Sequence, residues 1–262
     1  MREPGLEEAI RAAGGVSELA RRLGIAQPSV SNWERVPAER VASVEEATGI
    51  DRVRLRPDLF AARASADIDD VDAARAQEYA LLATLLARAP DSDLLARLAR
   101  LKSDASPLGA AHGKLAEAAG AADPARLEGE YFNLFIGVGR GEVLPYGSYY
   151  LTGFLHERPL ARLRGDLAEL GLARAEEQCE PEDHIAILCE VMAGLAGGRF
   201  AANAGDERRR AEKQFFDKHV APWARRFFAD LERAEAADFY RAVAAVGVTF
   251  IDVETEAFAL PS

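Results

Sequence analysis

The sequence predicts an all-α protein of two helical domains, and three observations carry this prediction. Alanine, leucine, arginine and glutamate dominate the chain, and these residues favour helix. Runs of β-branched residues, which favour strands, are scarce. Apolar residues recur every three or four positions between breaks of glycine and proline. With 262 residues, 49% of them hydrophobic and 29% charged, the chain has the composition of an ordinary globular protein large enough for two domains.

Residues 1–60 form the first predicted domain. A first amphipathic helix is expected to end at Gly14-Gly15, and a second covers residues 16–23. The Gly24-Ile25 step then allows a tight turn before a short third helix over residues 27–33. This spacing is typical of a helix–turn–helix motif, whose second helix enters the DNA major groove. We expect three polar side chains of that helix to face outward: Gln27, Ser29 and Asn32.

The same stretch, LEEAIRAAGGVSELARRLGIAQPSVSNWE, resembles the Cro/repressor-like group typified by the YdaS protein. The resemblance implies DNA binding, in which glutamine and asparagine side chains can pair with adenine edges. Arg21 and Arg35 are candidates for phosphate contacts, although nine arginines and ten acidic residues give residues 1–60 a net charge of −1. One module reads only half a DNA site, so this function would require a homodimer.

Residues 61–72, AARASADIDDVD, are small and polar, and we expect them to link the two domains. The helical spacing resumes over residues 73–262. Asp91 and the Asp123-Pro124 pair are expected to start two helices, because aspartate caps helix N-termini and proline suits the first turn. Trp223 is expected in the core of this second domain.

Three motifs mark the second domain. The first is EYFNLFIGVGRGEVLPYGSYYLTG at 130–153, a helix end that breaks at glycines and continues into a tyrosine-rich loop. The second is EPEDH at 180–184, which we expect to begin a helix, with Pro181 in its first turn and Asp183 and His184 at its exposed start. The third is FFDKHVAPW at 215–223.

Together these motifs resemble the family of cytoplasmic chaperones for molybdoenzyme maturation, the TorD/DmsD/NarJ type, over residues 71–258. The resemblance implies an all-helical domain that binds the twin-arginine signal peptide of a molybdenum-cofactor oxidoreductase, with the apo form of the catalytic subunit as partner. The side chains that it places at the peptide site are Tyr146, Ser148, Tyr149, Asp183 and His184. Val138 stands where the family often has a proline, and some members carry a tryptophan near the position of Tyr146; both departures bear on which client is bound.

The charge of the chain fits a basic partner. A net charge of −11 argues against coating nucleic acid or an anionic membrane surface. A twin-arginine leader has adjacent arginines followed by an apolar stretch. We expect the carboxylates of Glu180 and Asp183 to meet the arginines, and aromatic and aliphatic side chains to take the apolar part.

Neither catalytic nor cofactor chemistry is expected. The glycine-rich segment at 137–142, GVGRGE, lacks the lysine and hydroxyl residue of a phosphate-binding loop. The four histidines, at 112, 156, 184 and 219, do not have the spacing of zinc ligands, and Cys179 and Cys189 do not complete a ligand set with His184. We therefore predict no metal, no cofactor and no enzyme activity.

The N-terminal residues lack a signal-peptide core, and no apolar run reaches the length of a membrane span. A cytoplasmic location without membrane insertion is therefore expected. The basic run Arg208-Arg209-Arg210 has acidic neighbours, and we interpret it as a solvated helix face rather than a nucleic-acid patch.

Two functions remain open at this point. The first is a chaperone that binds the leader and holds the apo-enzyme for cofactor insertion before export. The alternative is a DNA-binding transcription regulator whose TorD-like domain senses the peptide or the apo-enzyme. The N-terminal module could also serve as a docking appendage that does not bind DNA.

Overall fold

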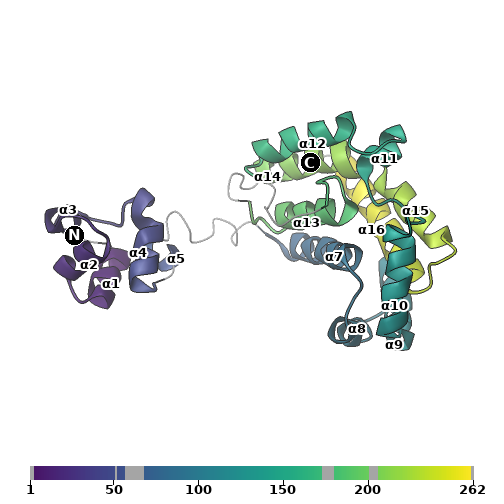
Figure 1. Ribbon diagram of the computed structural model, residues 1–262, viewed down its shortest axis with the longest axis horizontal. Helices are drawn as coiled ribbons and strands as arrows, with labels where there is room; N and C mark the ends of the chain where they lie inside the picture. Colours follow the sequence, from purple (N-terminus) through teal and green to yellow (C-terminus); the bar gives the residue numbers. More distant parts are fainter. Residues whose placement is uncertain (1–2, 51, 57–67, 173–179, 201–205, 261–262) are drawn as a thin grey trace. The chain divides into compact units, whose positions relative to one another are not determined.

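The computed structural model describes residues 3–50, 52–56, 68–172, 180–200 and 206–260. The end of the predicted first domain, residues 57–60, most of the predicted linker and Cys179 lie outside the described residues. Every regular element among the described residues is a helix, which confirms the all-α prediction (Figure 1). The chain falls into two compact units, residues 1–67 and 68–262.

The first unit is a small bundle around its own core. Its helices are α1 (Pro4–Ala13), α2 (Val16–Arg22), α3 (Gln27–Ser31), the short 3₁₀ turn η1 (Ala38–Arg40), α4 (Val41–Thr48) and α5 (Arg52–Leu55). Gly14 ends α1 in the left-handed conformation, with φ 93°, as the sequence indicates. Leu6, Leu19 and Val30 are fully buried and bring α1, α2 and α3 together. The α2–turn–α3 arrangement is thus held by apolar packing.

The second unit contains the remaining helices. They are α7 (Asp70–Ala87), α8 (Ser92–Leu98), α9 (Pro107–Ala121), α10 (Pro124–Tyr131), α11 (Gly147–Thr152), α12 (Arg158–Glu169), α13 (Ile185–Ala196), α14 (Asp206–Phe215), α15 (Ala224–Arg233) and α16 (Phe239–Ala259), with two single π-helical turns, η2 (Phe132–Ile136) and η3 (Phe216–Val220). The side chains of Asp91 and Asp123 cap α8 and α10, as expected. Single π-helical turns often accompany functional sites, and residues of η3 line the cavity described below.

Helix α13 lies at the centre of this unit, between α7 and α14 (Figure 1). It is apolar on all sides, which is the pattern of a buried helix. A second layer pairs α15 with α16, and α16 also packs on α9. Gly247 permits the close approach of α15, because a Cβ there would lie 2.2 Å from the ring of Phe228. Trp223 is 1% exposed, which confirms its predicted place in the core.

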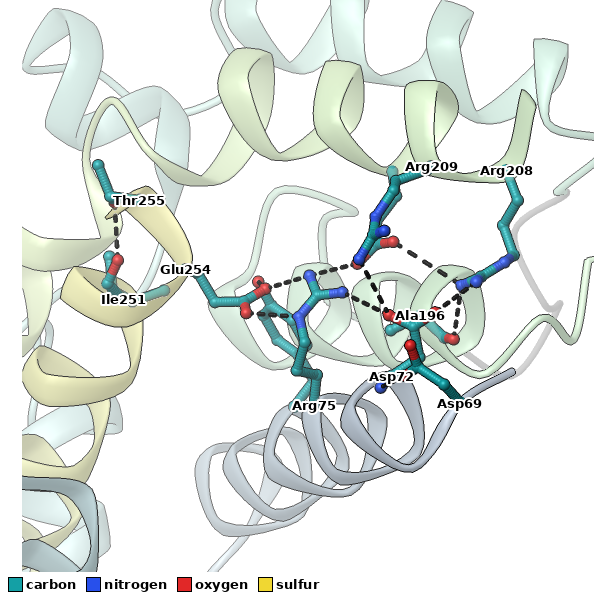
Figure 2. A network of polar contacts seen from close by, with 11 residues as sticks. Asp69, Asp72, Arg75, Ala196, Arg208, Arg209, Ile251, Glu254 and Thr255 are labelled. Atoms are coloured by element: carbon teal, nitrogen blue, oxygen red, sulfur yellow. Dashed lines mark hydrogen bonds and ion pairs between the residues drawn. The ribbon is translucent and has the colours of Figure 1, made fainter. Parts of the chain in front are cut away.

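A buried ionic network ties the start of α7 to α14 and α16 (Figure 2). The guanidinium of Arg75 pairs with Asp72 at 3.0 Å, Glu212 at 2.5 Å and Glu254 at 2.6 Å. Arg208 pairs with Asp72 and donates to the carbonyl of Ala196 at 2.9 Å. Burial opposes ionisation of Asp72, but the attraction of Arg208 and Arg75 outweighs this effect and lowers the pKa of Asp72.

This network corrects one prediction. Arg208 is only 7% exposed, so the interpretation of the run 208–210 as a solvated helix face is wrong for this residue. Arg208 is buried because its partner Asp72 lies on a helix 136 positions away in the sequence. Helix α7 begins at Asp70, within the range predicted for the linker, and the side chain of Asp69 caps it by accepting the N–H of Asp72 at 2.8 Å.

Candidate functional site

The candidate site forms where the loop before α11 meets the turn before α13. The N–H of Ile185 donates to the carbonyl of Pro145 at 2.8 Å, and the N–H of Gly147 donates to the carbonyl of Asp183 at 3.0 Å. Tyr146 and His184 thereby form an isolated antiparallel bridge. The backbone thus brings the tyrosine-rich loop and the EPEDH segment together, although about 35 residues separate them.

Asp183 anchors this junction. Its Oδ2 atom accepts the backbone N–H of Ser148 at 2.7 Å, in the first turn of α11. Its Oδ1 atom is buried and has no hydrogen-bond partner among the described residues. Asp183 is only 4% exposed. The carboxylate therefore has a structural role through one oxygen and an unused acceptor in the other.

His184 caps α13 instead of lying within its first turn. Its Nδ1 atom accepts the N–H of Ala186 at 3.1 Å, which assigns the proton of the neutral ring to Nε2. Burial lowers the pKa of His184 to about 4, although the carboxylates of Glu180 and Asp183 act in the opposite direction. The ring stands edge-on to that of Tyr146, with centroids 5.3 Å apart.

The geometry of the EPEDH segment differs from the prediction. The helix begins at Ile185, so Pro181 precedes it by a full turn and Asp183 and His184 are buried rather than exposed. The reason is the bonding to residues 145–148, which holds 181–184 in a turn. A sequence pattern of proline and acidic residues cannot distinguish a first helical turn from a turn held by another segment.

Glu180 and Tyr146 form the acidic face of the site. The hydroxyl of Tyr146 donates to Oε2 of Glu180 at 2.6 Å, and the Glu180 side chain is exposed. Burial and this carboxylate raise the pKa of Tyr146, so the hydroxyl remains a donor at neutral pH. Glu180 keeps free acceptor capacity toward solvent, which suits a cationic partner.

Tyr149 lies apart from the other predicted residues. Its hydroxyl accepts a hydrogen bond from Arg140 at 3.1 Å, and the guanidinium lies 5.4 Å from the ring centre. Tyr149 lines a smaller hollow of about 230 Å³ together with Asp230 and Arg233. The structure therefore brings Tyr146, Ser148, Glu180, Asp183 and His184 together, and places Tyr149 at a neighbouring surface.

A cavity of about 670 Å³ opens beside Asp183. It is lined by Gly147, Ser148, Leu151, Thr152, Arg158, Pro159, Arg162, Leu163, Asp166, Asp183, Leu188, Lys218, His219 and Trp223. Trp223 forms one wall, stacked on Tyr150 at 5.4 Å, and its indole N–H donates to the carbonyl of His219 at 2.7 Å. The volume of the cavity is in the range of ligand-binding pockets.

Sequence analysis missed two features of the site. Arg164 on α12 forms a two-pronged ion pair with Glu182, at 2.8–3.0 Å, and this pair fixes the turn against α12. Beside the cavity, Leu151, Phe154 and Leu155 are 43%, 69% and 41% exposed. Three adjacent exposed apolar side chains are typical of an interaction surface. Only the aromatic character of the loop pointed to this patch in advance.

In the first unit, the side chains predicted to face outward do so: Gln27, Ser29 and Asn32 are exposed on α3 and at its end. The two arginines predicted to contact phosphate are engaged in ion pairs. Arg21 pairs with Glu18 at 2.5 Å, and Arg35 lies 3.8 Å from Glu3. DNA would have to displace these exposed glutamates before the arginines could contact phosphates.

The part of the chain that the structure describes holds no cluster of three histidine, cysteine or acidic side chains that could bind a metal. Nor does any described helix combine the length and apolar character needed to cross a membrane.

Comparison with known proteins agrees with this architecture. Residues 101–229 match the nitrate reductase delta subunit family, and residues 6–64 match the bacterial toxin YdaS family. The chain is similar to the chaperone protein TorD of Aliivibrio fischeri, with 27% identity over 135 residues that cover 50% of this chain and 63% of TorD. Its similarity to the DmsD protein of Haemophilus influenzae, described as a Tat proofreading chaperone, is 32% over 117 residues, 44% of this chain and 53% of DmsD.

The chain spans less than two thirds of the length of these curated relatives. Among solved structures it resembles a crystal structure described as a redox enzyme maturation protein from Archaeoglobus fulgidus, with 21% identity and a TM-score of 0.44, over 68% of this chain and 93% of that one.

Fold and site thus define an all-helical domain with a buried polar turn beside a cavity, preceded in the sequence by a small helical module. Residues 101–229 of the second unit are similar to the nitrate reductase delta subunit family and to TorD-type chaperones, and residues 6–64 are similar to the YdaS family. The curated relatives are chaperones, a non-catalytic class, in agreement with the prediction that the chain is not an enzyme.

Proposed function

We propose that this protein is a cytoplasmic redox-enzyme maturation chaperone. It binds the twin-arginine signal peptide of a molybdenum-cofactor oxidoreductase and holds the apo catalytic subunit for cofactor insertion before export. The observation that carries this proposal is that the turn with the exposed carboxylate of Glu180 also places Asp183 in the wall of a cavity, and that this cavity shares Leu151 with an exposed apolar patch. The Tat proofreading chaperone among the relatives supports the same reading.

The chemistry of the site matches the two parts of such a leader. Guanidinium groups pair with carboxylates through two parallel hydrogen bonds, and Glu180 is the exposed carboxylate of the site. The apolar stretch of the leader would cover Leu151, Phe154 and Leu155 and so remove them from water. In this assignment the floor of the peptide site is formed by three buried residues, Ser148, Asp183 and His184. Tyr146 and Tyr149 contribute aromatic rings at its surface.

Calorimetry with the leader peptide of a cognate molybdoenzyme tests the proposal. The Glu180→Gln variant keeps the hydrogen bond from Tyr146 but removes the charge, so it should weaken binding by about 1.5–3 kcal/mol. Glu128→Gln, on the exposed surface of α10, is the matched control and should leave the affinity unchanged. Equal affinity of the Glu180 variant and the wild type would remove this carboxylate from the arginine site.

Asp183 and His184 need conservative variants, because both support the local fold. Alanine at either position would break a backbone cap as well as any peptide contact. Asp183→Asn and His184→Asn keep an acceptor at the capping position. Their affinities for the leader therefore report on peptide binding with less disturbance of the turn.

A second candidate function is a DNA-binding transcription regulator that senses the peptide or apo-enzyme. The exposed polar side chains on α3 favour it. A duplex from the gene's own promoter should then compete better than random DNA, and Gln27→Ala or Asn32→Ala should reduce that preference by roughly 1–3 kcal/mol. Arg21→Ala should weaken all sequences alike. DNA binding would require a homodimer, because one module reads only half a site. If footprinting at low salt finds no protected site, the module remains a docking appendage.

A further inference from the structure

Cationic side chains outnumber carboxylates in the cavity beside Asp183. Arg158, Arg162 and Lys218 line it, against Asp166 and Asp183. The carboxylate of Asp166 is already engaged, because His219 lies 2.6 Å from its Oδ2 atom and Lys218 donates to it at 3.1 Å. The acidic character of the whole chain therefore does not extend into this cavity.

Arg158 and Arg162 are the cations left over. They lie four residues apart at the N-terminal end of α12, and both are exposed. Neither forms an ion pair or side-chain hydrogen bond with any residue that the structure describes. Two unpaired guanidinium groups at the positive end of a helix favour an anion. Arg225, which is also exposed, does pair with a carboxylate, that of Asp252 at 2.6 Å.

Asp183 supplies a second, independent indication of a ligand. It lines the same cavity, and its buried Oδ1 atom lacks a donor among the described residues. A buried acceptor without a partner is costly, so a bound group that donates a hydrogen bond here would be favoured. Arg158 and Arg162 line the same cavity, and their positive charge disfavours a cationic donor of the client there. The donor expected at Asp183 is therefore uncharged.

We propose that the cavity takes an acidic residue of the bound client peptide. Its carboxylate pairs with Arg158 and Arg162, and a backbone N–H of the peptide donates to Oδ1 of Asp183. The inference rests on the proposed function and extends it, because it gives the leader a direction. The arginines stay outside at Glu180, and an acidic residue elsewhere in the peptide enters the cavity.

The walls of the cavity favour a peptide over a small free anion. Leu151, Pro159, Leu163, Leu188 and Trp223 supply apolar surface around the charged groups. Leu151 also belongs to the exposed apolar patch with Phe154 and Leu155, so the cavity continues onto the surface proposed for the apolar stretch. An extended segment can use both parts, whereas an inorganic anion would leave the apolar walls unused.

Synthetic peptides test this inference on the full-length protein. Each carries an Arg-Arg pair and an apolar stretch, and a single glutamate is moved through successive positions, with a glutamine twin for every position. At one position the glutamate peptide should bind roughly tenfold more tightly than its twin. The preference should vanish in the Arg158→Gln/Arg162→Gln variant and reverse toward the glutamine twin in Arg158→Glu/Arg162→Glu. Arg126→Gln, on α10, is the control and should preserve it.

If the twin-arginine peptides bind but glutamate is never preferred, the inference is overturned and the proposed function stands. A second measurement covers the case in which no twin-arginine peptide binds. In a Trp33→Phe background, Trp223 is the remaining tryptophan and lines the cavity. An acetylated, glutamate-containing peptide without arginine should change its emission saturably, and the Arg158→Gln/Arg162→Gln variant should abolish the change. An unchanged emission of the Trp33→Phe protein with Arg158 and Arg162 intact, at millimolar peptide, would also overturn the inference.

Discussion

His184 shows how one side chain can serve the fold at a position predicted to serve binding. Its neutral ring accepts the first free N–H of α13, and burial keeps the ring neutral by lowering its pKa to about 4. A proton on Nδ1 would remove the acceptor and place a charge among buried groups. The residue therefore couples the stability of the site to pH.

We expect this coupling to appear as a loss of stability in acid. Because the folded pKa is about 4 and the unfolded value is 6.5, the unfolded chain binds the proton first as the pH falls. Between pH 7 and pH 4.5, protonation of His184 should lower the free energy of unfolding by about 2–3 kcal/mol. His184→Asn keeps a capping acceptor that does not titrate, so urea denaturation at the two pH values should show a smaller loss. Identical pH dependence in both proteins would contradict the assignment.

Among the elements, α16 depends on a side chain from α10. The carboxylate of Glu130 accepts the N–H groups of Asp238, Phe239 and Tyr240 at 2.8–3.2 Å, which are orphan donors at the helix start. Asp238 occupies the capping position but makes no side-chain cap bond. The negative charge of Glu130 also lies at the positive end of the helix dipole.

Removing this charge should destabilise the second unit. Glu130→Gln should lower the free energy of unfolding by about 1–3 kcal/mol, because one carboxylate oxygen becomes an amide that cannot accept. Glu128→Gln, two positions earlier on the exposed side of α10, is the control and should have little effect. Chemical denaturation followed by circular dichroism measures both. A loss no larger than that of the control would show that solvent replaces the carboxylate.

Local signals in the sequence predicted the helices well. Asp91 and Asp123 cap the helices that follow them, and Gly14 ends α1, because each of these interactions spans only a few residues. The errors concern contacts between distant segments. The EPEDH segment became a turn through bonds to residues 145–148, and Arg208 became buried through Asp72, 136 positions away.

The distinction between local signals and long-range contacts also applies to the candidate site. The sequence motifs at 130–153 and 180–184 identified residues on two segments, and the structure brings Tyr146 and Glu180 of these segments into contact. The Arg164–Glu182 pair and the free arginines of α12 had no signal in the sequence, because their meaning depends on which helix packs beside the turn. Spacing along one helix cannot predict that neighbour.

At the scale of the whole molecule, each unit has its own core. Leu6, Leu19 and Val30 belong to that of the first unit, while Tyr79, Trp223 and Tyr240 belong to that of the second. A unit with its own core can fold alone. The two candidate functions therefore predict different behaviour when the units are separated, because a regulator requires communication between them and a chaperone does not.

For a chaperone, we expect a fragment of residues 68–262 to bind the leader peptide with the affinity of the full chain, within about twofold. In a regulator, leader binding would change the DNA affinity of the full chain, typically by about fivefold or more, and DNA would change leader affinity by the same factor. Calorimetry of the fragment and the full chain, with and without promoter DNA, measures both quantities. Equal leader affinities under all these conditions are the expected result. A reciprocal shift of fivefold would contradict the chaperone-only reading, because two independent units cannot produce it.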